Sequence, residues 1–280
     1  MTDKQLSLME SGSESLVQLA IAPDGTRSIV KTLRPGGTVN YPFEAFAYSQ
    51  LAALGARVPR VISVSPEALE MSAFDGETLD DLTYLYSSPD IFDEAAHDLA
   101  LARQITFTGF GTAIPSDQGF SGLLQSWQDF LDKGLLDLEN SKLLPQAMKD
   151  KFIDYWNRVA PDIELPQGML VHGDFSLSAV FVKDGEYEGL IDFGDAFIGD
   201  PLMDLAYFRF KEVTKDYGQL TYDHLAKAYI ENTQIDPAYL EQAVRLYMIY
   251  WAVKRIESKN LETDIVTKFL DKAQVLADSL

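Results

Sequence analysis

The sequence contains no cysteine, and this absence excludes several kinds of site. Disulfide frameworks, thiolate zinc sites and cysteine nucleophiles all need the missing thiol. A chain without cysteine fits a reducing compartment, so we expect a cytoplasmic protein. The beginning of the chain has no basic segment followed by an apolar one, and we therefore expect no signal peptide.

Long apolar runs are also missing. The longest, from Leu246 to Val253, is far shorter than the roughly 20 residues that a membrane-spanning helix needs. We interpret it as part of a buried helix and expect no membrane partner. Hydrophobic residues still make up 46% of the 280 residues, which is typical of a globular protein and allows two modest domains or one large one.

Basic residues are few, with 23 Lys and Arg against 43 Asp and Glu, for a formal net charge of -20. A field of this sign repels nucleic acid and anionic membranes, so we expect no nucleic-acid partner. The same field would attract a cationic substrate. Solubility alone explains it as well, and is the interpretation that we favour. The sequence does not indicate an oligomeric state.

The first 70 or so residues have the patterns of strands around one helix. Segments 16–21 and 28–33 flank Pro23-Asp24-Gly25, a strong hairpin signal. Segment 43–54 has helical periodicity and ends before a glycine. Two more strands are predicted over 60–65 and 68–74.

After Asp75-Gly76 the chain becomes mainly helical, apart from a β segment over 169–192. The predicted fold is therefore α+β and bilobal, with a β-rich N-terminal lobe over 1–75 and a larger helical lobe over 76–280. The helices of the second lobe are expected over 78–85, 91–106, 120–136, 145–159 and 202–280, the last with a break at Asp236-Pro237.

The β segment brings together two carboxylates. Asp174 lies in a polar loop after a short strand, and Asp192 ends a hairpin that runs out and back, so the two are expected at the same end of a small sheet. Like charges placed together are costly unless a cation lies near them. Without cysteine and with few histidines, the cation expected here is a hard one such as Mg²⁺, which substrate phosphates often complete.

The same stretch resembles the aminoglycoside phosphotransferase family, small-molecule kinases related to protein kinases. The resemblance covers nearly the whole chain, because the order of the lobes agrees as well. Its motifs are His172-Gly173-Asp174, Ile191-Asp192, Gly199-Asp200-Pro201 and Asp204-Leu205-Ala206.

The resemblance implies a role for each of these acidic residues. Asp174 would be the catalytic aspartate that accepts the proton of the substrate hydroxyl, and Asp192, which opens an Asp-Phe-Gly triplet, would bind Mg²⁺. His172 would brace the catalytic loop, Asp200 would hold the backbone of that loop, and Asp204 would begin the following helix.

The N-terminal lobe has matching nucleotide-binding residues. By resemblance, Lys31 in an otherwise apolar strand contacts the α- and β-phosphates and pairs with Glu44 in the next helix. The loop around Ser13 would cover the phosphates, with backbone N–H groups and hydroxyls as donors. The backbone around Met71 and Ala73 would hydrogen-bond the nucleobase.

One position departs from the family pattern. The family places an asparagine five residues after the catalytic aspartate, where it binds a second metal ion, whereas this chain has Ala179. Alanine has no side-chain oxygen, and Ser178 next to it is expected to point to the opposite face of a strand. The alternative function is thus a pseudokinase-like module that binds nucleotide without turnover.

The leading hypothesis is a phosphotransferase that moves the γ-phosphate of ATP or GTP to a hydroxyl of a small molecule. A cationic acceptor such as an aminoglycoside would suit the acidic surface, while choline, fructosamine, homoserine and macrolide acceptors of related groups stay open. A protein substrate is disfavoured, because Pro201 follows Asp192 within nine residues and leaves no room for a peptide-docking segment.

Overall fold

The computed structural model describes residues 4–11, 14–79, 90–212, 218–258 and 262–280. Its contacts divide the chain into two compact units. The first unit consists of Met1–Ile105 together with Leu177–Ala196, and the second of Thr106–Ser176 together with Phe197–Leu280. The mixed α and β architecture predicted from the sequence is confirmed, and each unit is described by itself below.

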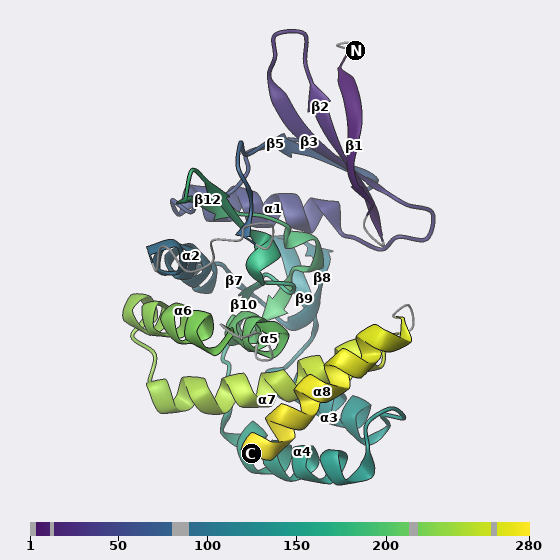
Figure 1. Ribbon diagram of the computed structural model, residues 1–280, viewed down its shortest axis with the longest axis vertical. Helices are drawn as coiled ribbons and strands as arrows, with labels where there is room; N and C mark the ends of the chain where they lie inside the picture. Colours follow the sequence, from purple (N-terminus) through teal and green to yellow (C-terminus); the bar gives the residue numbers. More distant parts are fainter. Residues whose placement is uncertain (1–3, 12–13, 80–89, 213–217, 259–261) are drawn as a thin grey trace. The chain divides into compact units, whose positions relative to one another are not determined.

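An antiparallel sheet in the order β1-β2-β3-β5-β4 begins the first unit (Figure 1). The predicted hairpin is confirmed between its second and third strands, where Asp24 accepts a hydrogen bond from the backbone of Thr26 and Gly25 has a φ of 87°. The strands are β1 (Gln5–Ser11), β2 (Ser15–Ile21), β3 (Arg27–Leu33), β4 (Val61–Val64) and β5 (Ala68–Ser72).

The predicted helix after this hairpin is confirmed as α1 (Tyr41–Ala53), which packs against β4 and β5 (Figure 1). It begins at Asn40, whose side chain accepts a hydrogen bond from the backbone N–H of Phe43. Such a cap satisfies one of the N–H groups that the first turn leaves without a partner. Glu44 lies in this first turn and is buried.

A second sheet completes the first unit, in the order β12-β11-β6, and α2 packs on β12. The buried carboxylate of Asp98 on α2 accepts hydrogen bonds from the Tyr187 hydroxyl and the Arg57 backbone, which ties the helix to β12 and to the segment between α1 and β4. Contacts of this unit therefore extend past residue 75, the boundary predicted from composition. Its elements are β6 (Glu77–Thr78), α2 (Asp90–Leu101), β11 (Val180–Lys183) and β12 (Glu186–Leu190).

The second unit contains a five-stranded sheet in the order β7-β10-β13-β8-β9. All of its pairs are antiparallel, and its inner strand β10 is fully buried. The strands are β7 (Thr106–Phe107), β8 (Phe110–Ser116), β9 (Gly119–Leu124), β10 (Gly168–Val171) and β13 (Phe197–Gly199).

The prediction of a helix over 120–136 is wrong in its first part, because β9 occupies those residues. The chain turns at Gly119, with a φ of 104°, and runs back along β8. A Cβ at Gly122 would lie 1.9 Å from the backbone nitrogen of Phe110, so this close pairing needs glycine. The helix begins only after Ser126, which forms a capping box with Asp129.

Helices make up the rest of the second unit, and α7 packs against α3, α4, α5 and α8. The predicted break before α7 is confirmed at Asp236, whose side chain accepts a hydrogen bond from the Tyr239 backbone. In the described part of the chain, the helices are too short or too polar to traverse a bilayer. The helices are α3 (Trp127–Glu139), α4 (Gln146–Val159), α5 (Leu202–Glu212), α6 (Gly218–Thr233), α7 (Pro237–Ile256) and α8 (Thr263–Ser279).

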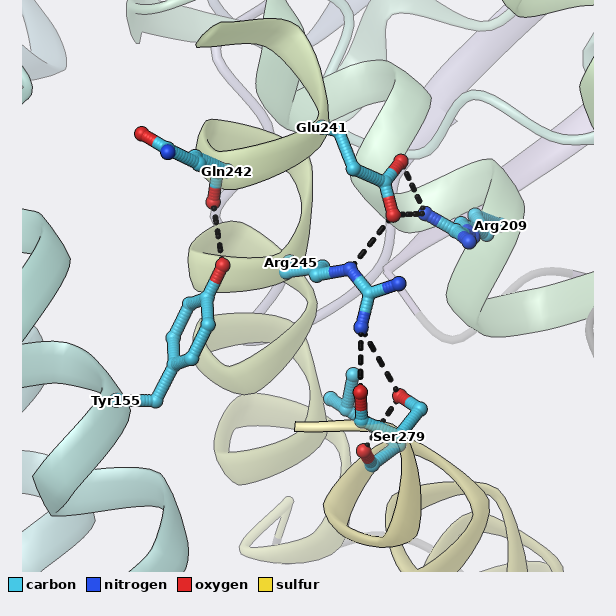
Figure 2. A network of polar contacts seen from close by, with 7 residues as sticks. Tyr155, Arg209, Glu241, Gln242, Arg245 and Ser279 are labelled. Carbon is cyan, nitrogen blue, oxygen red and sulfur yellow. Dashed lines mark hydrogen bonds and ion pairs between the residues drawn. The ribbon is translucent and has the colours of Figure 1, made fainter. Parts of the chain in front are cut away.

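A charged network joins three of these helices (Figure 2). Arg209 on α5 donates to both carboxylate oxygens of Glu241 on α7, at 3.0 and 2.9 Å. Arg245, one turn further along α7, donates to the same carboxylate and also to the backbone oxygen of Ser279 at the end of α8, as Figure 2 shows. The Arg209 contact joins α5 to α7, and the bond from Arg245 to Ser279 holds the end of α8 against α7.

Candidate functional site

A buried lysine lies between two carboxylates in the first unit. The Nζ of Lys31 is 2.6 Å from the Glu44 Oε1 and 2.7 Å from the Asp192 Oδ1. The Lys31 and Glu44 side chains are 9% and 0% exposed, whereas that of Asp192 is 59% exposed. The pair predicted between Lys31 and Glu44 is therefore present, and Asp192 joins it.

Three different elements place these side chains. Lys31 lies in β3, whose register sets it opposite Val17 of β2 and Leu69 of β5. Glu44 is in the first turn of α1. Asp192 follows β12 with a φ of 67°, a left-handed conformation that is uncommon and strained for a residue other than glycine.

The Tyr48 side chain supports this strained aspartate. The Tyr48 hydroxyl accepts a hydrogen bond of 2.8 Å from the Asp192 backbone, and its ring packs edge-on against Phe193. Burial raises the pKa of Tyr48, which therefore keeps its proton at neutral pH. The tyrosine on α1 thus helps to hold the start of the Asp-Phe-Gly turn.

The cluster carries opposite charges, with Lys31 and Glu44 buried and Asp192 exposed. Burial alone would lower the pKa of Lys31, but attraction to Glu44 and Asp192 raises it well above its ordinary value. Burial raises the pKa of Glu44, and the charge of Asp192 raises it further, against the effect of Lys31. Lys31 is consequently a permanent cation, as a residue that neutralises phosphate charge must be.

Replacing Lys31 with methionine is expected to weaken ATP binding at least about tenfold, because a charge-assisted hydrogen bond to a phosphate contributes more than a kilocalorie. Isothermal titration with ATP measures this change. Lys183→Met is the matched control, since Lys183 in the same unit forms an exposed pair with Asp75. Equal ATP affinity of Lys31→Met and the wild type would contradict the assigned role of Lys31.

The other predicted nucleotide contacts are only partly covered by the structure. Met71 lies inside β5, between β3 and β4, and Ala73 follows the end of that strand. Their contacts with a nucleobase stay a prediction. Ser13 lies outside the described residues. Glu14 beside it accepts hydrogen bonds from the backbone and the hydroxyl of Thr38.

The loop that carries Asp174 lies in the second unit and follows β10. Both Asp204 carboxylate oxygens receive backbone N–H groups of this loop, from His172 at 2.8 Å and from Gly173 at 2.9 Å. The N–H of Asp174 donates to the Nδ1 of the buried His172 ring, at 3.3 Å. This bond assigns the proton of a neutral His172 to Nε2, because Nδ1 is the acceptor.

Asp204 was expected only to begin a helix, yet it binds the loop directly. Burial raises its pKa to about 7, against the two backbone hydrogen bonds, which lower it. Asp200, which was expected to hold the loop, accepts hydrogen bonds from the Leu202 backbone and the Tyr247 hydroxyl, and so links the start of α5 to α7. The bracing expected of His172 agrees with its burial and its hydrogen bond to Asp174.

Arg255 is a contact of Asp174 that sequence reasoning missed. Its Nη2 is 2.7 Å from the Asp174 Oδ1, and the two side chains are 30% and 32% exposed. Nothing in the local pattern of α7 distinguished this arginine from an ordinary cation near the end of a helix. Asp174 and Asp192 belong to different units, and a divalent ion shared between them stays a prediction.

The residue pattern is compatible with Mg²⁺ at Asp192. This ion is commonly held by one or two carboxylates and completed by waters and phosphates, and the Asp192 carboxylate is exposed enough to take part. Ala179 lies close to Asp192 in the fold. The backbone N–H of Ile191, the residue before Asp192, donates a hydrogen bond of 2.9 Å to the Ala179 carbonyl. Among the described residues, no group of three or more acidic or histidine side chains forms a metal cage.

The expectation for Ser178 rested on a strand that the structure does not have. Residues Leu177–Ala179 form a 3₁₀ turn, and β11 begins only at Val180. Successive side chains of such a turn point about 120° apart, so Ser178 still does not take the direction of the Ala179 side chain. Ala179 itself is 2% exposed.

A small sheet with one helix, a buried lysine paired to a glutamate of that helix, and an Asp-Phe-Gly turn are together typical of the N-terminal lobe of a protein-kinase-like fold. Residues 5–242 match the family model APH, described as the phosphotransferase enzyme family, and the chain belongs to this family. The comparison with proteins of curated function finds no significant match.

Several solved structures share the fold. An aminoglycoside phosphotransferase, a thermostable mutant of APH(4)-Ia in ternary complex with ADP and hygromycin B, is 19% identical with a TM-score of 0.74, covering 98% of this chain and 94% of its own. A proposed fructosamine-3-kinase of Thermobifida fusca is 16% identical with a TM-score of 0.70, over 100% and 95%. Macrolide 2'-phosphotransferase type I is 18% identical with a TM-score of 0.62, over 98% and 91%.

Proposed function

We propose that this protein transfers the γ-phosphate of ATP or GTP to a hydroxyl group of a small molecule. The observation that carries the proposal is Lys31, a buried cation bonded at once to Glu44 and to the exposed carboxylate of Asp192. Such a cation beside a carboxylate suits the triphosphate and metal ion of a kinase, where catalysis is mainly positioning and charge neutralisation.

Each residue has a definite task in this proposal. Lys31 binds the α- and β-phosphates, and Glu44 holds the lysine in place. Asp192 would bind Mg²⁺, which when present neutralises charge on the β- and γ-phosphates. Asp174 orients the acceptor hydroxyl and takes its proton as the oxygen attacks the γ-phosphorus, whose bond to the β–γ bridging oxygen breaks and releases the nucleoside diphosphate. Asp204 and His172 hold the backbone on which Asp174 sits.

The similar proteins support a nucleotide and a small molecule as the two substrates. They do not identify the acceptor of this chain. A structurally similar aminoglycoside phosphotransferase binds ADP and hygromycin B, and others with the same fold are named for macrolides and fructosamines. These names share phosphate transfer and differ in the acceptor. A cytoplasmic location stays a prediction from the sequence, and neither nucleic acid nor a membrane enters the proposal.

Thermal-shift titrations with ATP and GTP, with and without MgCl₂, test the nucleotide part of the proposal. Binding that strengthens in MgCl₂ is expected, because Asp192 would hold the ion and the ion would neutralise phosphate charge. An assay of nucleotide-dependent phosphate transfer to a panel of hydroxylated small molecules then tests the reaction. Binding of neither nucleotide would contradict the proposal as a whole.

Ala179 favours a second candidate function, a module that binds nucleotide without turnover. Its side chain lacks a metal-binding oxygen and is buried beside Ile191, the residue before Asp192. Binding of nucleotide with no transfer to any acceptor would support this module.

The substitution Ala179→Asn distinguishes the two functions. If the protein is a working enzyme, the wild type already turns over, and the added oxygen changes kcat by less than about tenfold, or about 1.4 kcal/mol in the barrier. Ala179→Val controls for the added bulk at this buried position. An inactive wild type together with an active Ala179→Asn variant would overturn the expectation and identify Ala179 as a lesion.

A further inference from the structure

Two cations flank the loop of Asp174 in the second unit. Arg255 on α7 is paired with Asp174 itself, and Lys211 on α5 donates to the Ser176 hydroxyl at 2.8 Å. A third, Lys272 on α8, donates to the backbone oxygen of Lys211. Two helices, α5 and α7, thus bring positive charge to one short loop, in a chain whose formal net charge is -20.

Aromatic rings hold the first two cations in place. The guanidinium of Arg255 lies 4.7 Å from the ring centre of Tyr207 and 5.9 Å from that of Trp251. The Nζ of Lys211 lies 5.8 Å from the same Tyr207 ring. Tyr207 and Trp251 are 3% and 8% exposed, so these cations rest on a rigid apolar wall rather than on mobile surface chains.

Both cations have hydrogen-bond capacity left. A guanidinium has five N–H donors and an ammonium has three. The Nη2 of Arg255 meets Asp174 and its Nε is buried without a partner in the described residues, so a ligand would meet the remaining N–H groups of Nη1 and Nη2. Lys211 uses one donor on Ser176. A group with several acceptor oxygens could therefore bind here without displacing the contacts that are present.

The positions of Arg255 and Lys211 indicate which chemical groups the acceptor carries near its reacting hydroxyl. This inference rests on the proposed function. An acceptor hydroxyl must come within about 2.6–3.2 Å of the Asp174 carboxylate to lose its proton there. The Arg255 Nη2 is itself 2.7 Å from that carboxylate. Groups a few bonds away from the reacting hydroxyl consequently lie within reach of the guanidinium.

We propose that the acceptor carries an anionic oxygen group, such as a carboxylate, and that Arg255 and Lys211 bind it. A guanidinium matches the two oxygens of such a group in its fork geometry. An amine in the same place would meet like charges, which costs binding free energy. The distant acidic residues do not reverse this preference, because charges more than about 8 Å away are screened at physiological salt.

Three sugars that differ chiefly in charge test the proposal: glucuronate, glucose and glucosamine. Their affinities for the whole protein can be measured by ligand-observed NMR. Glucuronate is expected to bind at least about tenfold more tightly than glucose, because it gains one charge-assisted hydrogen-bonded pair. Glucosamine is expected to bind more weakly than both. Equal affinities, or a preference for glucosamine, would overturn the proposal.

Variants assign the preference to particular residues. Arg255→Gln and Lys211→Gln are each expected to reduce the glucuronate-to-glucose ratio, and Arg255→Lys to retain part of it. Lys254→Gln is the matched control, because this neighbour of Arg255 on α7 pairs with Asp137 instead. Equal weakening of all three sugars by Arg255→Gln and by Lys211→Gln would indicate a structural role and count against the proposal.

The transfer assay separates this proposal from the one on which it rests. Absence of phosphate transfer to every acceptor, with the charge preference in binding intact, would contradict the proposed function alone. Transfer to glucosamine in preference to glucuronate would leave the phosphotransferase function standing and contradict the anionic acceptor.

Discussion

Asp174→Asn is expected to lower kcat by roughly 10²–10⁴, the usual contribution of a positioned general base. ATP affinity should stay nearly unchanged, since the proposal assigns phosphate binding to Lys31 and to the Mg²⁺ that Asp192 would hold. Asparagine has the shape of aspartate and can still accept the hydrogen bond from Arg255, but it takes no proton at neutral pH. Steady-state kinetics with saturating acceptor and isothermal titration with ATP measure the two quantities separately.

The control for this variant is Asp184→Asn. Asp184 lies at the exposed turn between β11 and β12 with a φ of 53°, a conformation that asparagine also tolerates. Asp184→Asn removes one negative charge, as Asp174→Asn does, without touching the loop of Asp174. Comparable losses of kcat and ATP affinity in Asp174→Asn would count against the general-base role.

Asp204→Asn is expected to destabilise the second unit and to distort the loop of Asp174. The carboxylate accepts one backbone N–H on each oxygen, whereas an amide must turn its NH₂ group toward one of these donors. A buried donor left without an acceptor costs about 1–3 kcal/mol in the free energy of unfolding. Urea denaturation measures this loss, and Asp154→Asn on α4, whose side chain is 82% exposed, is the control.

The contribution of Asp204 to the free energy of unfolding should decrease as pH rises. Its pKa is raised from 3.8 to about 7 in the folded protein, mainly by burial. The folded state therefore binds this proton more tightly than the unfolded state, and the linked stabilisation is complete below about pH 4 and lost as pH rises toward 7. The difference in stability between the wild type and Asp204→Asn should shrink over this interval. A difference that stays constant as pH rises from about 5 to 7 would show that the carboxylate is already ionised in the folded protein.

Local patterns were sufficient to predict much of the first unit. Asp24 and Gly25 form the hairpin turn because their preferences are set by their own backbone, and the helix with Glu44 follows from its periodicity. The pairing of Lys31 with Glu44 came from the resemblance to known kinases, and the 2.6 Å contact agrees with it. The turn and the helix depend on a few neighbouring residues, and the Lys31–Glu44 pair was predicted from a known kinase motif.

The hairpin of β8 and β9 shows where local patterns mislead. Residues 120–136 contain apolar positions at helical spacing, but Gly122 lies against Phe110 with no room for a Cβ, and the pairing of the two strands outweighs helix propensity. The extent of the first unit was missed for a related reason. Asp98 bonds to Tyr187, 89 positions away, and joins a helix to a hairpin that composition assigned to the other lobe.

By itself the sequence indicated Lys31, Asp174 and Asp192 as the residues of phosphoryl transfer, through short motifs that resemble those of known kinases, and their roles stay a prediction. Only the tertiary structure decided that Asp204 holds the loop and that Arg255 meets Asp174, contacts that span 32 and 81 positions of the chain. The physical reason is that, for residues so far apart in the sequence, burial and helix packing determine which groups a charged side chain contacts, and the local sequence pattern does not.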